Sequence, residues 1–258
     1  MRRRGAALTL LFCIPAYSTY AGAWPEPAGE TQAIFKYEGS VASSAFDPSG
    51  ARVAIPHLRD DSLSLFVEHG LTDRLTLQAK AALTEGEDQY VHYSGRGPVE
   101  LGLRYALIDN PKGVLSIYVG AVSAGVGRNA GYAPPHAGDG DVELRVLAGR
   151  NATLWGKPLF GEVQVARLFR RGLQDETHLD ATLGWKPSPR WLVLTQLYAG
   201  RADPGGTNGP TAPEWAKLEA SVVRHLGRWS LQAGWRQAVW GRETPAERGP
   251  VIGVWRRF

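Results

Sequence analysis

Apolar and polar residues alternate with a period of two along most of the chain that follows residue 30. Between residues 99 and 107, Val99, Leu101 and Leu103 share one face, while Glu100 and Arg104 share the other. Alternation of this kind predicts β-strands, and almost no stretch shows the 3.6-residue period of an amphipathic helix. The chain is therefore expected to be all-β.

Twelve segments carry the alternation, separated by turn residues. They span residues 31–39, 61–70, 73–84, 97–108, 113–123, 141–150, 157–169, 176–186, 190–200, 214–226, 228–240 and 249–258. A tilted strand needs about 9–11 residues to cross a bilayer, and bacterial single-chain barrels have even strand numbers. The pattern predicts a single transmembrane antiparallel up-and-down β-barrel of about 12 strands.

The connections between these segments alternate in length. Short turns are expected at residues 70–73, 109–113, 154–157, 186–189 and 226–227, and long loops at about 40–60, 85–96, 124–140, 170–175, 201–213 and 241–248. Short periplasmic turns and long extracellular loops are the pattern of outer-membrane barrels. Both ends of the barrel domain then lie on the short-turn, periplasmic side.

The two faces of each strand have different solvents. A charge must face water or a partner, so in a membrane barrel the charged face lines the lumen and the apolar face meets lipid. A soluble barrel allows the same alternation with the faces exchanged. The start of the chain, the loop asymmetry and the chain end favour the membrane barrel.

The first residues read as an export signal. Arg2–Arg4 form a positive stretch, residues 6–14 form a short apolar core, and Ala21-Gly-Ala23 matches an A-x-A cleavage site. We expect residues 1–23 to be a signal peptide and residues 24–258 to be the barrel domain. Cys13, the one cysteine, lies in the removed part.

Removal of the signal also changes the charge. The formal net charge is +4, and losing three arginines leaves 4 − 3 = +1. A nucleic-acid partner therefore lacks electrostatic support. We expect an exported protein of the Gram-negative outer membrane.

Aromatic residues gather near the expected strand ends, as in the aromatic girdles of membrane barrels. These residues are Trp185, Trp191, Trp215, Trp229, Trp240 and Trp255. The chain stops at Phe258 after alternating apolar residues, which resembles the closing strand that the barrel-assembly machinery recognises. Arg256 stands where an aromatic residue is usual, and its side chain can snorkel to the headgroups.

Three stretches carry a narrower resemblance: Trp24-Pro-Glu-Pro-Ala-Gly29, Phe46-Asp-Pro-Ser-Gly50 and Glu68-His-Gly-Leu-Thr-Asp-Arg-Leu-Thr-Leu77. They resemble a group of Gram-negative barrels described as transporters similar to the outer-membrane proteins of phenol meta-pathway operons. The resemblance covers the signal, the first hairpins and the last strand. It implies the fold and the location, and hardly constrains the substrate.

Catalytic motifs are nearly absent: the chain has no GxSxG, HExxH or P-loop. Asp139, Asp141 and Glu143 alternate at a loop base, where solvated rim acids are favoured over a Ca²⁺ site. His178 and Asp180 point the same way on one strand and are favoured as a lumen polar pair. The alternative is a hydrolase acting on envelope lipid. We expect no enzyme, no metal and no cofactor.

Charges at inward positions indicate the solute path. The candidate lumen-lining residues are Lys36, Glu38, Glu68, Lys80, Glu100, Arg104, Glu143, Arg145, Glu162, His178, Asp180, Lys217, Glu219 and Arg236. Six cations face seven carboxylates, so pairs across strands can narrow the lumen. Arg104 is expected in a wet lumen, where its loss costs little stability.

The sequence therefore favours a monomeric outer-membrane channel for small solutes with a charge-lined, partly occluded lumen. A closed structural or surface-binding barrel is a further alternative. The expected partners are outer-membrane lipid, an unidentified small solute, and the assembly machinery through Phe258.

The cleavage site gives the first testable prediction. Sequencing the N-terminus of the envelope form should yield Trp24, because Ala21 and Ala23 supply the small residues that signal peptidase requires. An outer-membrane form that begins at Met1 would contradict export by a cleaved signal.

Overall fold

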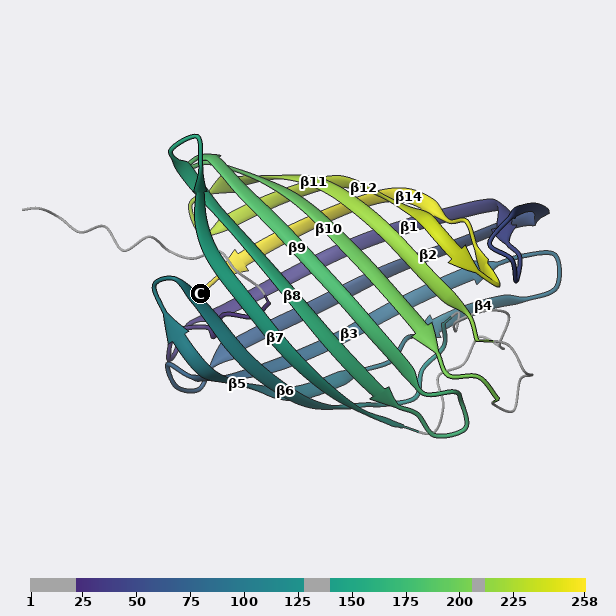
Figure 1. Ribbon diagram of the computed structural model, residues 1–258, viewed down its shortest axis with the longest axis horizontal. Coiled ribbons are helices and arrows are strands. Elements are labelled where there is room, and N and C mark those ends of the chain that lie inside the picture. The colour runs from purple at the N-terminus through teal and green to yellow at the C-terminus, as the bar shows by residue number, and fades with distance from the viewer. Residues whose placement is uncertain (1–21, 128–139, 206–211) are drawn as a thin grey trace, which may run out of the picture.

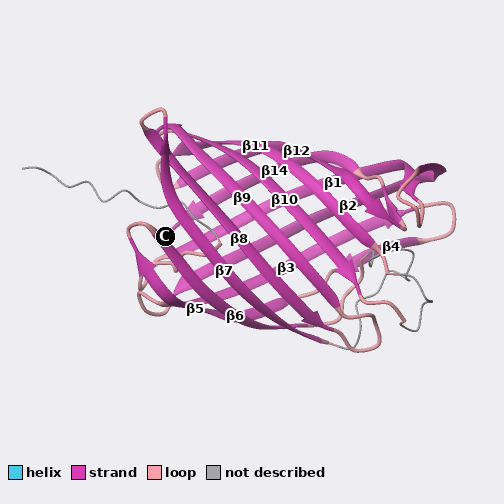
Figure 2. Ribbon diagram, in the orientation of Figure 1, coloured by secondary structure: helices cyan, strands magenta, loops and turns pink. Residues whose placement is uncertain are grey.

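A closed barrel of twelve antiparallel strands forms the molecule, as the alternation predicts. The computed structural model describes residues 22–127, 140–205 and 212–258. Its strands are β1 (Thr31–Phe46), β2 (Arg52–Gly70), β3 (Leu75–Glu87), β4 (His92–Arg96), β5 (Glu100–Asn110), β6 (Gly113–Val122), β7 (Asp141–Leu154), β8 (Lys157–Phe169), β9 (Glu176–Ser188), β10 (Trp191–Ala202), β11 (Glu214–Leu226), β12 (Trp229–Arg242), β13 (Thr244–Pro245) and β14 (Arg248–Arg257). Figures 1 and 2 show them as one tilted sheet curled on itself.

Closure comes from the pairing of the first and last strands. Each wall strand pairs with its neighbours along the chain, and β1 pairs with both β2 and β14. The β1–β14 register runs from Gln32 opposite Arg257 to Val41 opposite Arg248. The short strands β4 and β13 pair with β3 and β1 and lie outside the wall order. A closed wall leaves no strand edge unpaired, as a lipid environment requires.

The outward face is apolar and the inward face is polar. Leu101 and Val146 are 55% and 54% exposed, whereas Arg104 and Glu219 are 0% and 1% exposed. Exposed apolar surface running right around a protein is untenable in water, because monomeric soluble proteins rarely expose patches beyond a few hundred Å². The lumen is therefore the polar interior, and lipid is the solvent of the apolar face. Among the described residues, no helix is long and apolar enough to cross a membrane.

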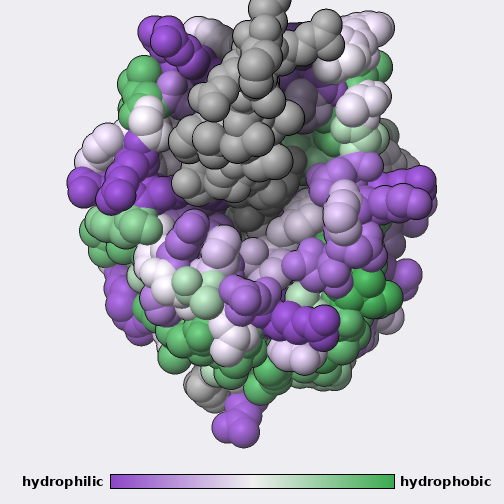
Figure 3. Space-filling model, turned by 90° about the vertical axis from the view of Figure 1, so that its left-hand side faces the viewer, coloured by the Kyte–Doolittle hydropathy of each residue, from purple (hydrophilic) through white to green (hydrophobic). Residues whose placement is uncertain are grey.

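Short turns and both ends of the wall lie at one end of the barrel. The C-terminus lies beside the β5–β6 and β7–β8 turns, at the left of Figure 1. Figure 3 looks onto this end, with hydrophilic side chains along the rim and hydrophobic ones on the flank. The opposite end carries the longer connections.

Three of the expected long loops are partly strand. Residues 40–60 continue the β1–β2 hairpin with only residues 47–51 between the strands, residues 85–96 contain the end of β3 and β4, and residues 241–248 contain β13. These hairpin tops show no clear two-residue alternation, because beyond the bilayer both faces of a ribbon can meet water. The strands predicted from the sequence pattern are therefore too short at this end of the barrel.

The tryptophans divide between the two faces. Trp191, Trp229 and Trp240 are 41–44% exposed on the outside, as a girdle requires. Trp215 and Trp255 were wrongly assigned to the girdle, because both lie inside: Trp215 packs edge-on to His178, and Trp255 donates to Gln232 over 3.1 Å. Both residues keep the two-residue period of their strands, Trp215 with Lys217 and Trp255 with Gly253, so position near a strand end does not by itself indicate the outer face.

Trp185 packs edge-on against the turn residue Trp155, with ring centroids 5.5 Å apart.

Two arginines also have outward positions. Arg256 lies 4.5 Å from the centroid of the Trp229 ring and 4.7 Å from that of Phe258, so it is held among aromatic rings near the short-turn end. Arg167 follows Val163 and Val165 on the outer face without a bulge, and pairs with Asp175 and Asp203 at the long-loop end.

Closure predicts heat-modifiable mobility. The unheated protein should migrate faster on a detergent gel than the boiled protein, because a closed wall has no free edge at which unfolding can begin. Val254→Pro should weaken the fast band, because Val254 lies inside the closing strand opposite Phe35 and Leu231, where proline cannot donate a ladder hydrogen bond. Identical mobility of boiled and unheated wild type would contradict closure.

Candidate functional site

All fourteen predicted lumen residues lie on the inward face, but they do not form one evenly charged tube. Most are gathered into ion-pair clusters on the wall, and two of them hold a segment of chain inside the barrel. Lys80 and Asp180 form no ion pair with any residue that the structure describes. The path has a wide upper part near the long connections and a filled lower part near the short turns.

One cluster joins β5, β6 and β7. The Arg145 guanidinium pairs with Glu100 and, over 2.6 Å, with Glu143. Tyr118 donates its hydroxyl proton to Glu100, and its ring lies 4.3 Å from the guanidinium. Each charge therefore has a partner at fixed geometry, which is what burial of an ion pair requires.

A second cluster joins β1, β11 and β12. Arg236 pairs with Glu38 and with Glu219, the latter over 2.6 Å, and lies 4.5 Å above the Tyr198 ring. Lys36 contacts the same two carboxylates over 2.8 Å and 3.4 Å. Lys217 lies two residues before Glu219 on the inward face of β11. It pairs with Glu247 of the loop between β13 and β14 instead of joining this cluster.

A cavity of about 540 Å³ lies between these clusters at the long-connection end. Glu38, Lys80, Glu100, His178, Lys217 and Arg236 line it, together with Tyr93 and Trp215. We call this cavity the vestibule. Its volume lies within the 300–1,000 Å³ range of small-molecule sites.

His178 lies in the vestibule wall with a partner that the sequence did not indicate. Its Nε2 lies 2.8 Å from Glu176, not at hydrogen-bond distance from Asp180, and Glu176 also binds Arg170 over 2.6 Å. Asp141 pairs with the same Arg170, and Glu143 with Arg145, so neither is the solvated rim acid that was expected. Asp139 lies outside the described residues. Within the described ranges, no three His, Cys, Asp or Glu side chains form a group suited to a metal ion.

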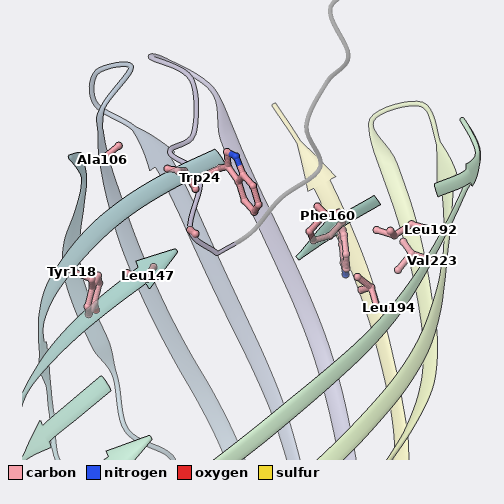
Figure 4. Close-up of a cluster of buried hydrophobic side chains, with 11 residues drawn as sticks. Trp24, Ala106, Tyr118, Leu147, Phe160, Leu192, Leu194 and Val223 are labelled. Carbon is pink, nitrogen blue, oxygen red and sulfur yellow. The ribbon is translucent and has the colours of Figure 1, made fainter. Parts of the chain in front are cut away.

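The lower lumen is filled by the segment that precedes β1. Residues 22–30 enter from the short-turn end, and Ala23, Trp24 and Glu26 are 0%, 7% and 3% exposed. Trp24 points toward Phe160 inside the barrel, with ring centroids 6.0 Å apart and planes at 88° (Figure 4). We call residues 22–30 the N-terminal segment. It narrows the path at the end opposite the vestibule.

Arg104 anchors this segment to the wall. Its guanidinium donates to the carbonyl oxygens of Gly22 and Trp24 and pairs with Glu68 over 2.5 Å, and Gln78 donates to the same carboxylate. Arg104 and Glu68 are fully buried, so the expectation of a wet lumen around Arg104 is wrong.

Two more hydrogen bonds hold the segment against β3 and β6. Thr76 accepts from the Glu26 N–H over 3.0 Å, and Ser116 donates to the Ala23 carbonyl over 2.7 Å. Ala28 forms an isolated bridge with Gly70, where a Cβ would lie 2.0 Å from the Pro27 oxygen. Two inward glycines, Gly70 and Gly149, thus make room for the segment. Glycines at inward positions were therefore the one feature of the sequence that could have indicated a segment inside the lumen.

Comparisons with known proteins agree with the barrel. No family model and no curated protein sequence matches the chain. Among solved structures, the COG4313 outer membrane channel from Pseudomonas putida F1 superposes with a TM-score of 0.69 at 16% identity, over 92% of this chain and 98% of that one. The NanC porin gives 0.57 at 10% identity, over 86% and 98%. The translocator domain of the autotransporter NalP from Neisseria meningitidis gives 0.53 at 13% identity, over 90% of each chain.

At these identities the likeness concerns the fold, which is that of outer-membrane barrels. The narrower resemblance to the barrels of phenol meta-pathway operons stays a prediction.

The buried Arg104–Glu68 pair gives a prediction on stability. Arg104→Ala should lower the free energy of unfolding by about 3–5 kcal/mol, because it leaves a buried carboxylate unpaired. Arg59→Ala should change it by at most about 1 kcal/mol, because the Arg59–Asp61 pair is solvent-exposed on the arginine side. Urea unfolding in lipid vesicles measures both, and equal losses would show that Arg104 is not buried.

The raised pKa of Glu26 predicts that docking of the segment depends on pH. Burial, and next the charge of Glu68, raise the pKa of Glu26 from 4.5 to about 7, against the opposing charges of Arg257 and Arg104. The docked segment therefore binds a proton that the released segment gives up between pH 4.5 and about 7. Docking is strongest below this window and weakens as the pH rises through it.

Conductance in planar bilayers should accordingly rise as the pH is raised from 4.5 to above 7. Glu26→Gln should flatten this dependence, because the amide does not titrate. An unchanged pH profile in Glu26→Gln would assign the dependence to another group.

Proposed function

We propose that the chain is a Gram-negative outer-membrane channel for small solutes, with an expected cleaved signal peptide and Phe258 as the element read by the assembly machinery. One observation carries the proposal: the inward face forms a polar vestibule of about 540 Å³ above a narrowing made by the chain's own N-terminal segment. The likeness in fold to barrels described as a channel and a porin supports it.

The vestibule favours small polar solutes that carry both charges or neither. Its carboxylates and cations lie within a few ångströms of each other, so a solute meets both signs along the wall. Lys80 lines the vestibule without an ion pair to any described residue, so its ammonium group is free to interact with a passing solute. Rings of one sign would instead select ions of the other sign.

The position of His178 does not support the lipid-hydrolase alternative. His178 faces the vestibule and packs against Trp215, whereas a residue that attacks lipid must reach the outer face. Release of fatty acid by the refolded protein, lost in His178→Ala, would restore this alternative.

Conductance tests the proposal directly. Arg104→Ala should raise single-channel conductance and cation preference, because in the processed chain the substitution removes the hydrogen bond to the Trp24 carbonyl and leaves Glu68 uncompensated. The selectivity shift should shrink in 1 M salt, where the Debye length falls to about 3 Å.

Arg145→Ala is the matched control. It removes a lumen arginine of the upper cluster that makes no contact with the segment, so the rise in conductance should be smaller. The fast band on an unheated gel verifies that each variant is folded. If neither wild type nor Arg104→Ala conducts at any salt concentration, the channel is contradicted and a closed barrel takes its place.

A further inference from the structure

One buried carboxylate of the lumen differs from all the others. Each remaining buried acid among the described residues has a cation within 4.0 Å: Glu26 (Arg257), Glu68 (Arg104), Asp141 and Glu176 (Arg170), Glu143 (Arg145) and Glu219 (Arg236). Glu162 on β8 is 8% exposed and forms no ion pair with the described part of the chain. Its Oε2 accepts instead from the backbone N–H of Ala23 over 2.9 Å.

A buried carboxylate is costly unless a positive group compensates it. The expected cleavage after Ala23 creates such a group. Trp24 would then begin the chain, and its backbone nitrogen would become an ammonium group one residue from the nitrogen that Glu162 already binds. Successive Cα atoms lie only about 3.8 Å apart, so a small adjustment of the Glu162 side chain reaches it.

The rest of Trp24 is held independently of Ala23. Its carbonyl accepts from Arg104, and its indole lies edge-on to Phe160, two residues before Glu162 on the same face of β8. Gly149, the β7 partner of Glu162, leaves room for the ring: a Cβ there would lie 2.4 Å from the indole. These wall residues therefore match three features of an N-terminal tryptophan, namely its ring, its carbonyl and its ammonium group.

We propose that the lumen contains a binding site for the chain's own processed end, in which Glu162 pairs with the α-ammonium of Trp24 while Arg104 and Phe160 hold its carbonyl and indole. The proposal rests on the cleavage expected for the proposed export. In this view, signal removal supplies the charge that completes the lumen, and the new ion pair strengthens the hold of the wall on the segment.

The reactivity of the N-terminal amine tests the site without any measure of transport. An acylating reagent near neutral pH prefers the α-amine, whose pKa of about 7.7–8.0 lies well below that of lysine. In the folded mature protein the Trp24 amine should react at least about tenfold more slowly than in the peptide Trp-Pro-Glu-Pro-Ala-Gly, because ion pairing disfavours the neutral, reactive form. Lys112, in an exposed turn, is the internal reference.

Glu162→Gln should return the rate toward that of the peptide, and Asp180→Asn should not, because no segment contact of Asp180 exists in the described structure. If Glu162→Gln does not fold, Gly149→Ala gives the second test, since its methyl group displaces the indole and should also expose the amine. A wild-type amine that reacts like the peptide overturns the proposal. So does a folded Glu162→Gln that stays protected, or a mature chain that retains Ala23.

Conductance then separates this proposal from the channel function. Acetylation of the amine and Glu162→Gln should each raise conductance. The two changes together should raise it no further than either alone, because both break the same ion pair. Additive increases would contradict a direct pair. A protected amine in a barrel that never conducts would preserve the site and refute the channel.

Discussion

The requirement that charges in the middle of the wall strands face inward governs this structure. Lipid offers neither hydrogen bonds nor counterions, so the backbone must close on itself and the polar side chains must share one interior. A twelve-stranded barrel is too narrow to leave that many charges separately hydrated. The charges therefore pair, and pairing places Arg145, Arg236 and Arg104 at the centres of separate clusters on the wall.

The Arg104 cluster differs from the other two in what completes it. Arg145 and Arg236 are satisfied by carboxylates and aromatic rings of the wall itself. Arg104 has one carboxylate and uses its remaining donors on carbonyls of the N-terminal segment. The segment is thus a structural part of the lower lumen, and its release would uncover Arg104 and Glu68 together.

The sequence was sufficient for the wall but not for its contents. Period-two alternation predicts strand number, order and inward face, because lipid and lumen impose opposite polarities on neighbouring residues. It misjudged the hairpin tops, where both faces meet water, and the tryptophans near strand ends. It placed all fourteen lumen residues inside, yet gave His178 the wrong partner, because Glu176 and Asp180 flank it at equal spacing on the same face of β9 and the period alone cannot choose between them. The N-terminal segment has no periodicity, and only inward glycines such as Gly149 hinted at it.

A reversible tether between the segment and the wall tests the central claim most directly. The expected mature chain has no cysteine, and Glu26 and Thr76 are joined by a backbone-to-side-chain hydrogen bond of 3.0 Å, so Glu26→Cys with Thr76→Cys places the only two thiols side by side. Single-channel conductance should be low in the oxidised protein and rise when the disulfide is reduced. Failure of the disulfide to form, or equal conductance with and without a verified disulfide, would contradict a lumen narrowed by its own N-terminal segment.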